Sequence, residues 1–200
     1  VAAGRARALL EDGRAARGAV LDDGRVLRAG CVVLAAGWAA GGVDGGVPLR
    51  PVKGQTLRLR WGVGDERPVR RVVRTPSVYV VPRPDGSVVV GATAEEGRDL
   101  SARSDGVHRL LDDAFEAVPA LRETAFEEVA VGIRPATPDG RPAVGPGRLD
   151  GLVWAVGGYR HGVLLTPWAA DVVVESIAAS ADVPEHCRPD RFADREAACA

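Results

Sequence analysis

The amino-acid sequence predicts an α/β protein whose middle section is an antiparallel sheet. The first observation is a series of short apolar, β-branched segments at 51–61, 69–74, 77–83 and 87–93, separated by turn residues. The second is an apolar segment at 152–156 that runs through glycines into a longer apolar segment, a strand–turn–helix pattern. The third is a continuous apolar run at 31–35, typical of a strand covered on both faces.

The N-terminal segment predicts a helix followed by a hairpin. Residues 1–12 have the composition of a helix end, and Gly13 is its stop signal. Two strand-like segments, 15–21 and 25–28, flank the turn sequence Asp-Asp-Gly and predict a hairpin. The apolar strand at 31–35 then ends in a turn of small residues.

The middle section contains the clearest helix of the chain. Residues 104–119 place their apolar side chains along one stripe, and Ser104 or Asp105 could cap the first turn. Before this helix, Pro-Asp-Gly at 84–86 joins two strands as a hairpin. A further strand is expected after it, at 126–133.

The C-terminal section holds the most informative stretch, residues 132–167. Arg134 precedes a proline, which favours an extended backbone at the arginine, and Thr-Pro-Asp-Gly at 137–140 predicts a tight turn. The glycine-rich segment after the strand leads into a helix at 163–177, with Pro167 expected in its first turn. Glycines let a ligand approach the backbone, and the N–H groups and dipole of a helix start favour an anion there.

Composition excludes several classes of protein. With 46% hydrophobic and 26% charged residues and a net charge of −1, the 200-residue chain has no basic field that would favour nucleic acid or an anionic membrane. No apolar run approaches the ~20 residues that cross a bilayer. Cys31, Cys187 and Cys199 lack the spacing of a metal site or a disulfide framework, so we expect no metal and a reducing cytoplasm. The polar tail from Asp182 predicts a loosely held segment.

Six segments stand out along the chain: VVLAAG (32–37), PVKGQTL (51–57), VYVVPR (78–83), VVVGAT (88–93), GIRPATPDGRPAVG (132–145) and GGYRHGVLLTPWAAD (157–171). In this order they resemble the FAD-dependent amino-acid oxidases of the D-amino acid oxidase superfamily, and within it the glycine oxidase group of thiamine synthesis. The family's GxGxxG fingerprint in an N-terminal βαβ unit is absent from the sequence. We therefore expect a partial sequence that lacks this unit.

The resemblance also implies a domain organisation. Residues 1–47 and 135–200 would form the remainder of a doubly wound, discontinuous FAD-binding domain of α/β type. Residues 48–134 would form a substrate-binding α+β domain built on the antiparallel sheet.

The resemblance assigns roles to residues at the matching positions. Arg134, in the Gly-Ile-Arg-Pro motif, would bind the substrate carboxylate with its planar guanidinium. Tyr79 would line the substrate cavity, and Arg160 would lie near both substrate and flavin. Local sequence alone favours a surface role for Arg134 and a packing role for Tyr79. The residues expected to contact the cofactor are Ala36, Gly37, Lys53, Gly158, Tyr159, Arg160, His161, Gly162, Val163 and Leu164.

The chemistry implied is oxidative deamination of glycine or another small amino acid. No side chain is expected to be catalytic, because hydride passes to the flavin and then to oxygen, giving imine or oxo acid and hydrogen peroxide. The imine would feed thiazole synthesis for thiamine. Sarcosine oxidase and D-amino acid dehydrogenase are alternatives within the superfamily, and a non-catalytic truncated remnant is an alternative of another class. The resemblance also allows a homo-oligomer.

Overall fold

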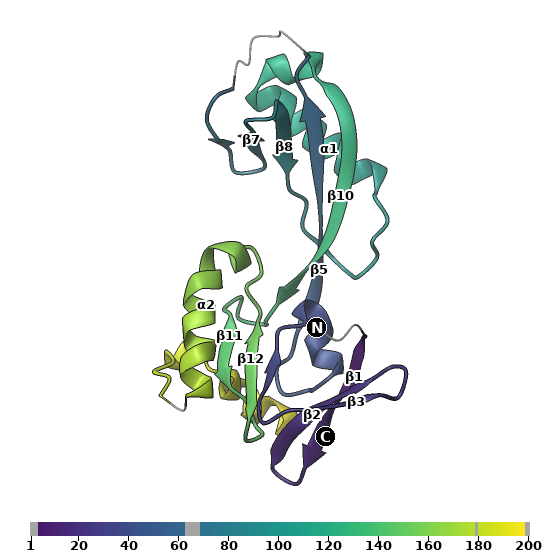
Figure 1. Ribbon diagram of the computed structural model, residues 1–200. Coiled ribbons are helices and arrows are strands. Elements are labelled where there is room, and N and C mark those ends of the chain that lie inside the picture. Colours follow the sequence, from purple (N-terminus) through teal and green to yellow (C-terminus); the bar gives the residue numbers. More distant parts are fainter. Residues whose placement is uncertain (1–3, 63–68, 179, 199–200) are drawn as a thin grey trace. The chain divides into compact units, whose positions relative to one another are not determined.

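The computed structural model describes residues 4–62, 69–178 and 180–198. The chain divides into two compact units (Figure 1). The first unit combines Val1–Pro51 with Arg134–Ala200, and the second is Val52–Ile133. The boundaries fall inside two long strands, β5 (Arg50–Arg60) and β10 (Ala125–Ala136).

The first unit begins with an antiparallel sheet of three strands, β1 (Ala6–Asp12), β2 (Ala15–Leu21) and β3 (Val26–Arg28). The predicted hairpin of β2 and β3 is confirmed. The helix expected over residues 1–12 is wrong for the part described, because β1 pairs along its length with β2, Leu9 facing Ala19. The Ala, Arg, Leu and Glu residues of β1 favour a helix in isolation, and pairing with a neighbouring strand overrides that preference.

A second sheet of the first unit has the order β11 (Ala143–Pro146), β12 (Leu152–Val156) and β4 (Val32–Leu34). Strand β12 is antiparallel to β11 and parallel to β4. Both predicted apolar strands, 31–35 and 152–156, are therefore present. Within the residues described, however, β4 is not covered on both faces, because Val33 is 40% exposed.

Helix α2 (Gly162–Ile177) packs on β11 and β12 (Figure 1). It begins one residue before the predicted start, so Pro167 is an interior residue in its second turn, a correction to the expected first turn. Pro167 has no N–H to donate to the preceding turn of the helix. One residue earlier, the Thr166 hydroxyl donates to the Gly162 carbonyl at 2.8 Å. A 3-10 helix, η1 (Gly37–Gly42), follows β4.

The C-terminal tail is packed, contrary to the expectation that it is loosely held. It contains the 3-10 helices η3 (Glu185–Cys187) and η4 (Pro189–Ala198). Val183 and Cys187 are buried with Val144 of β11, and Phe192 joins the core of the first unit. The prediction failed because three apolar side chains, spaced among charged ones, are enough to anchor the segment. Cys199 lies outside the described residues.

An ion pair between a buried carboxylate and a half-exposed arginine stabilises the first unit. The Asp44 side chain is fully buried and accepts a hydrogen bond from Arg148 Nε at 2.8 Å. Arg148 also donates to Glu11 of β1 at 2.9 Å. These bonds raise the pKa of the Arg148 guanidinium, chiefly through Asp44. A buried carboxylate without such a partner would cost several kcal/mol, on the order of 3–5.

The second unit contains the predicted antiparallel sheet, in the order β10-β5-β8-β7-β6 with β9 also paired to β5. Its remaining strands are β6 (Val73–Arg74), β7 (Tyr79–Pro82), β8 (Ser87–Gly91) and β9 (Glu95–Glu96). The hairpin at 84–86 joins β7 to β8, as predicted. The first part of the strand expected at 69–74 is not a strand, and only its last two residues pair with β7.

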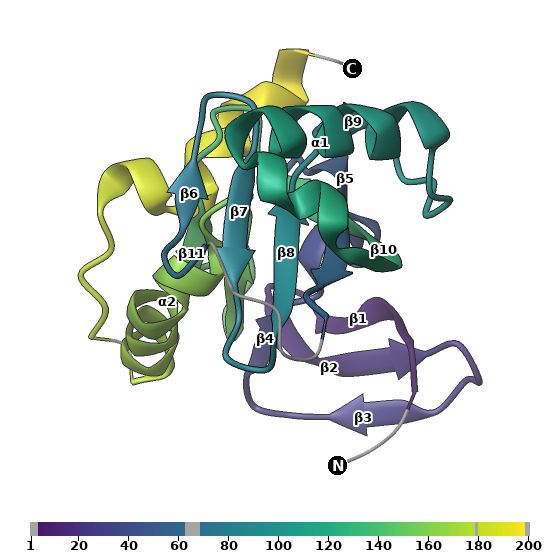
Figure 2. The ribbon, with the colours of Figure 1, turned by 90° about the horizontal axis from the view of Figure 1, so that it is seen from above.

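Helix α1 (Ser104–Ala117) lies across one face of this sheet, and the 3-10 helix η2 (Pro119–Glu123) follows it (Figure 2). Leu110 and Ala114 face the strand residues Val88 and Val90 in the core. The expected side-chain cap from Ser104 or Asp105 is wrong, because Arg103 occupies the N-cap position and makes no side-chain cap bond. Its backbone N–H donates instead to the side chain of Gln55, on β5, at 2.7 Å.

Candidate functional site

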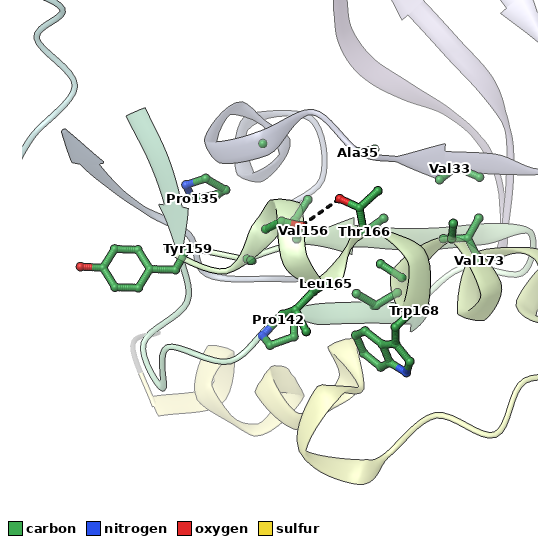
Figure 3. Close-up of a pocket in the computed structure, with 18 of the residues that line it drawn as sticks. Val33, Ala35, Pro135, Pro142, Val156, Tyr159, Leu165, Thr166, Trp168 and Val173 are labelled. Carbon is green, nitrogen blue, oxygen red and sulfur yellow. Dashed lines mark hydrogen bonds between the residues drawn. The ribbon is translucent and has the colours of Figure 1, made fainter. Parts of the chain in front are cut away.

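A cavity of about 570 Å³ opens in the first unit, where β4 and β12 end and α2 begins (Figure 3). Ligands of α/β proteins bind outside the carboxyl ends of parallel strands, and β4 and β12 are parallel to each other. No charged side chain is among the described residues that line the cavity. The lining at the strand ends consists of Ala35, Gly37, Pro135, Gly157, Gly158, Tyr159 and Gly162.

The turn from β12 to α2 is compact because of its glycines. Gly157 has φ +77°, a conformation that favours glycine. A Cβ on Gly158 would lie 2.7 Å from the Gly162 Cα, so any side chain would push the turn away from the helix start. Tyr159 has φ +44°, a strained value for a residue with a side chain, and its N–H donates to the Pro135 carbonyl at 3.1 Å. Strain of this kind is typical of ligand-binding turns.

The start of α2 presents unsatisfied donors. Its first intrahelical bond runs from Leu165 N to His161 O at 2.9 Å, which leaves the N–H groups of Gly162, Val163 and Leu164 without an intrahelical acceptor. No acidic residue lies in the first turn, so the positive end of the helix dipole is not neutralised locally. The Val163 and Leu164 side chains are 93% and 77% exposed. This helix start is suited to stabilising negative charge on a largely apolar ligand.

The structure brings some of the predicted cofactor residues together. Gly37, Gly158, Tyr159 and Gly162 line the one cavity, and Ala36 lies between two of its lining residues. The other predicted contacts of this unit are exposed at the α2 start and do not line the cavity: Arg160, His161, Val163 and Leu164. Their contact with a cofactor stays a prediction.

The predicted substrate residues lie in both units. Arg134 is half-buried in β10, directly before Pro135, which lines the cavity. Tyr79 belongs to the second unit, where it pairs with Gly91 of β8. A Cβ on Gly91 would collide with the Tyr79 ring, so the ring lies across this glycine. The joint action of Arg134 and Tyr79 on one substrate stays a prediction.

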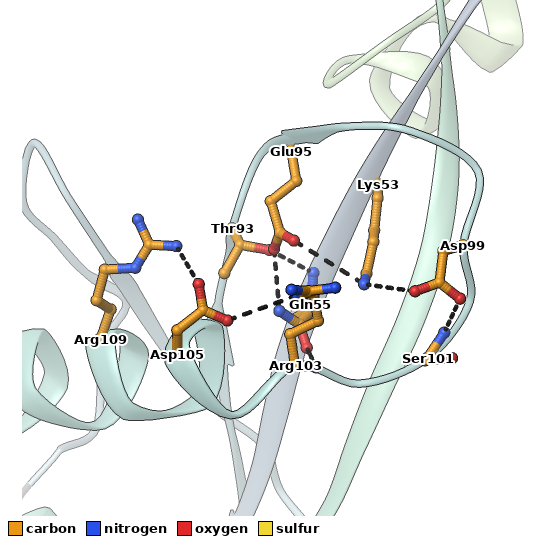
Figure 4. A network of polar contacts seen from close by, with 9 residues as sticks. All are labelled: Lys53, Gln55, Thr93, Glu95, Asp99, Ser101, Arg103, Asp105 and Arg109. Carbon is orange, nitrogen blue, oxygen red and sulfur yellow. Dashed lines mark hydrogen bonds and ion pairs between the residues drawn. The ribbon is translucent and has the colours of Figure 1, made fainter.

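Lys53, also predicted to contact the cofactor, is buried in a polar network of the second unit (Figure 4). Its side chain is 3% exposed, and its ammonium lies 3.9 Å from Glu95 and 3.7 Å from Asp99. Local sequence alone favours an exposed strand lysine, which the structure excludes. The network holds the segment after β8 against β5, and a role of Lys53 towards a cofactor stays a prediction.

Gln55 is the centre of that network. It is fully buried and donates to Glu95 at 2.9 Å, while its backbone N–H donates to the Thr93 hydroxyl at 2.9 Å. Burial raises the pKa of Glu95, but the bonds from Thr93 and Gln55 and the nearby Lys53 ammonium outweigh it and lower that pKa. Glu95 is therefore an ionised structural residue and not the solvated loop carboxylate that sequence alone favours; Glu96 is exposed.

Sequence reasoning missed the apolar half of the cavity, which α2 and the strands supply. Its lining includes Val33, Leu165, Trp168, Ala169 and Val173. A signal was present, because the segment 163–177 is apolar on nearly all sides, a pattern typical of a helix covered by other elements.

Among residues 4–62, 69–178 and 180–198, no group of three or more His, Cys, Asp or Glu side chains could hold a metal ion. Within the same residues, no helix has the length and apolar character needed to cross a membrane.

Comparison with known proteins identifies the family. Residues 2–176 match the model of DAO, described as FAD dependent oxidoreductase. The chain belongs to the DAO family of FAD dependent oxidoreductases. This confirms the predicted family, the α/β fold class and FAD as the family's cofactor. The cavity and the unsatisfied α2 start lie inside the matched residues.

Individual relatives agree with this assignment. The chain is 40% identical over 164 residues to the bifunctional protein ThiO/ThiG of Synechocystis, covering 80% of this chain and 24% of that protein. It is 33% identical over 130 residues to the glycine oxidase of Bacillus subtilis, covering 64% of this chain and 34% of the enzyme. The chain therefore spans well under half the length of these relatives.

Solved structures share the fold of this chain. Iminodiacetate oxidase from Chelativorans aligns with a TM-score of 0.82 at 28% identity, over 91% of this chain and 52% of that protein. Glycine oxidase from Bacillus cereus aligns with a TM-score of 0.81 at 22% identity, over 89% of this chain and 50% of that enzyme.

Proposed function

We propose that this chain forms part of an FAD-dependent amino-acid oxidase of the glycine oxidase type. The observation that carries the proposal is the cavity at the ends of β4 and β12, bordered by the uncapped start of α2, in a chain of the DAO family. The residues present fit a flavin, because glycines admit a flat ring close to the backbone and the lining is apolar.

Bound FAD would supply the hydride acceptor that no side chain provides. The turn residues Gly157 and Gly158 would let the ring approach the backbone. The N–H groups of Gly162, Val163 and Leu164 would stabilise the negative charge of the reduced ring, an electrostatic role that needs no side chain. The exposed Val163 and Leu164 side chains would be covered in the process.

Substrate binding would fall to Arg134, Tyr79 and Arg160. Arg134 would hold the substrate carboxylate with two parallel N–H donors, which fixes the amino acid in one orientation. The Tyr79 hydroxyl and Arg160 would be further contacts of a small substrate such as glycine. Oxygen would be the final electron acceptor, and the products would be the imine or oxo acid and hydrogen peroxide.

The biological role we propose is supply of the imine for thiazole synthesis in the making of thiamine. It is supported by the name of the Synechocystis relative and by the putative thiamine biosynthesis oxidoreductase ThiO of Rhizobium etli, 36% identical over 142 residues. A cytoplasmic location and a small amino acid with oxygen as the reactants are part of the same proposal.

The first experiment is a visible absorption spectrum of the 200-residue chain after incubation with excess FAD and gel filtration. A retained flavin spectrum is expected. Anaerobic addition of glycine, sarcosine or D-alanine should then bleach this spectrum. The amino acid that bleaches it at the highest rate indicates the substrate class. A chain that elutes colourless would contradict the claim that these residues hold the cofactor.

Arg134→Ala tests the carboxylate contact. We expect the amino-acid concentration for half-maximal bleaching to rise at least about tenfold, while flavin binding is unchanged. Arg134→Lys keeps the charge and should recover only part of the loss. Arg5→Ala is the control, because the Arg5 side chain is 84% exposed. If the Arg134→Ala and Arg5→Ala variants need the same amino-acid concentration for half-maximal bleaching, Arg134 does not bind the substrate.

A further inference from the structure

The segment that follows β8 turns back and binds β5. The Thr93 N–H donates to the Gln55 carbonyl at 3.1 Å, and the Thr93 hydroxyl accepts a hydrogen bond from the Gln55 N–H at 2.9 Å. Further along the same segment, Glu95 pairs with Lys53 in the ladder of β9 and β5. Gln55 therefore binds this segment through both of its backbone polar groups.

The Gln55 side chain joins the same segment to the start of α1 (Figure 4). Its amide N–H donates to the Glu95 carboxylate at 2.9 Å, and its amide oxygen accepts from the Arg103 N–H at 2.7 Å. Arg103 is the N-cap residue of α1. A carboxylate could not replace this amide, because it lacks the donor that Glu95 requires. One side chain thus binds two segments, each through a different half of the amide.

The packing around Gln55 holds its side chain in one position. Gln55 is fully buried, and α1 passes directly over it at Gly106, where a Cβ would overlap the amide nitrogen. The Thr93 hydroxyl also donates to the Glu95 carboxylate, so Gln55, Thr93 and Glu95 form one connected set of hydrogen bonds. A buried amide left without its partners is strongly unfavourable. A displacement of Gln55 would therefore displace the segment as well.

The Tyr79 ring lies on the residue from which this segment departs. Gly91 ends β8 and pairs with Thr56 of β5 on one side and with Tyr79 of β7 on the other. A Cβ on Gly91 would meet the hydroxyl end of the ring, so the phenol lies directly over the glycine backbone. Thr93 is two residues further along the chain. The position of the Tyr79 hydroxyl therefore depends on the path that the bonds to Gln55 impose on the chain after Gly91.

We propose that Gln55 is a positioning residue for Tyr79. Its hydrogen bonds to Glu95 and Arg103 hold the segment after Gly91 against β5, and that segment supports the tyrosine hydroxyl. Gln55 is fully buried, so it presents no surface of its own to a substrate. The consequence for catalysis rests on the proposed function, in which Tyr79 contacts the substrate, whereas the position of the ring can be measured without substrate or flavin.

Two variants separate the hydrogen bonds of Gln55 from its size. Gln55→Glu keeps the shape but places a second carboxylate against Glu95 with no N–H between them, so the segment should move away from β5. Gln55→Glu combined with Glu95→Gln exchanges the two groups and restores one donor between them. The Arg103 N–H finds an acceptor oxygen in both variants. Val72→Glu, which adds a carboxylate at a residue 62% exposed in the same unit, is the control.

Proton chemical shifts of Gly91 in the isotope-labelled 200-residue chain report the position of the ring. The ring current of Tyr79 should displace these shifts, and Tyr79→Ala should abolish the displacement. At about pH 8, where both carboxylates are ionised, Gln55→Glu should lose most of the displacement and the exchanged double variant should regain it. If Gln55→Glu does not fold, the double variant should still fold with wild-type Gly91 shifts. Wild-type shifts in Gln55→Glu, or no recovery in the double variant, would overturn the proposal.

Bleaching of the bound flavin by glycine is the second measurement. Gln55→Glu should raise the glycine concentration for half-maximal bleaching at least about threefold, with an unchanged dissociation constant for FAD, and the double variant should reverse the change. Val72→Glu should match the wild type in both measurements.

The two measurements can fail separately. If the Gly91 shifts follow the expected pattern while the glycine concentration stays constant, Tyr79 does not contact the substrate. That result would contradict its role in the proposed function and leave its positioning by Gln55 in place. A chain that binds no FAD would likewise contradict the proposed function, and the Gly91 shifts would still decide the role of Gln55.

Discussion

The Arg191 guanidinium donates to both carboxylate oxygens of Asp139, at 2.9 and 3.2 Å. Arg191 also donates to the Arg141 carbonyl at 3.0 Å. The C-terminal tail therefore binds the turn that follows Pro135 at two residues, Asp139 and Arg141. Its side chain is only 13% exposed, and it lies 4.1 Å from the centre of the Phe192 ring. The tail therefore fixes the turn next to the cavity.

Arg191→Ala should destabilise the first unit by about 1–2 kcal/mol, because it removes a forked, charge-assisted pair and leaves the Arg141 carbonyl without that donor. Urea unfolding followed by circular dichroism measures the change. Arg5→Ala, which removes an exposed pair at 3.8 Å, should change stability by less than about 0.5 kcal/mol. Equal effects of the two variants would show that the tail contact contributes nothing.

Acid should weaken the same contact. The hydrogen bonds from Arg191 are the main cause that lowers the pKa of Asp139 well below its ordinary value. The ionised carboxylate therefore stabilises the fold above about pH 4 and loses this contribution as the pH falls towards the lowered pKa. Wild type should exceed Asp139→Asn in stability at pH 6, and the difference should shrink below about pH 4. A difference that stays constant with pH would contradict this account.

Gly91→Ala should destabilise the second unit by about 1–3 kcal/mol, because the added methyl group collides with the Tyr79 ring. Thermal unfolding of the variant measures the loss. The collision is absent in the Tyr79→Ala background, so Gly91→Ala should lower the free energy of unfolding much less there than in the wild type. The double variant should therefore be more stable than the sum of the two single losses predicts. Additive effects would show that the ring does not lie across Gly91 in solution.

Gly158→Ala should weaken FAD binding about tenfold, because its Cβ would displace the start of α2 at Gly162. Flavin fluorescence titration of the 200-residue chain measures the dissociation constant. Gly132→Ala is the matched control, since no atom lies within 4 Å of its Cβ position. An unchanged dissociation constant for Gly158→Ala would place the flavin away from this turn.

Local pattern predicted most of the second unit. The alternation along β5, the Pro-Asp-Gly hairpin and the apolar stripe of α1 each report the side that faces the core, and the structure has all three. The same local signals failed for β1 and for the tail, where contact with distant segments decides the conformation.

The sequence by itself determined the family, because the glycines of the β12–α2 turn and the Gly-Ile-Arg-Pro segment before Ala136 are local features that can be read along the chain. Only the tertiary structure decided which side chains are buried together. Lys53 and Glu95 lie 42 residues apart in sequence and meet 3.9 Å apart because β5 and β9 pair. Likewise, α2 packs on β11 and β12, and this brings its side chains to the same cavity as the glycine turn.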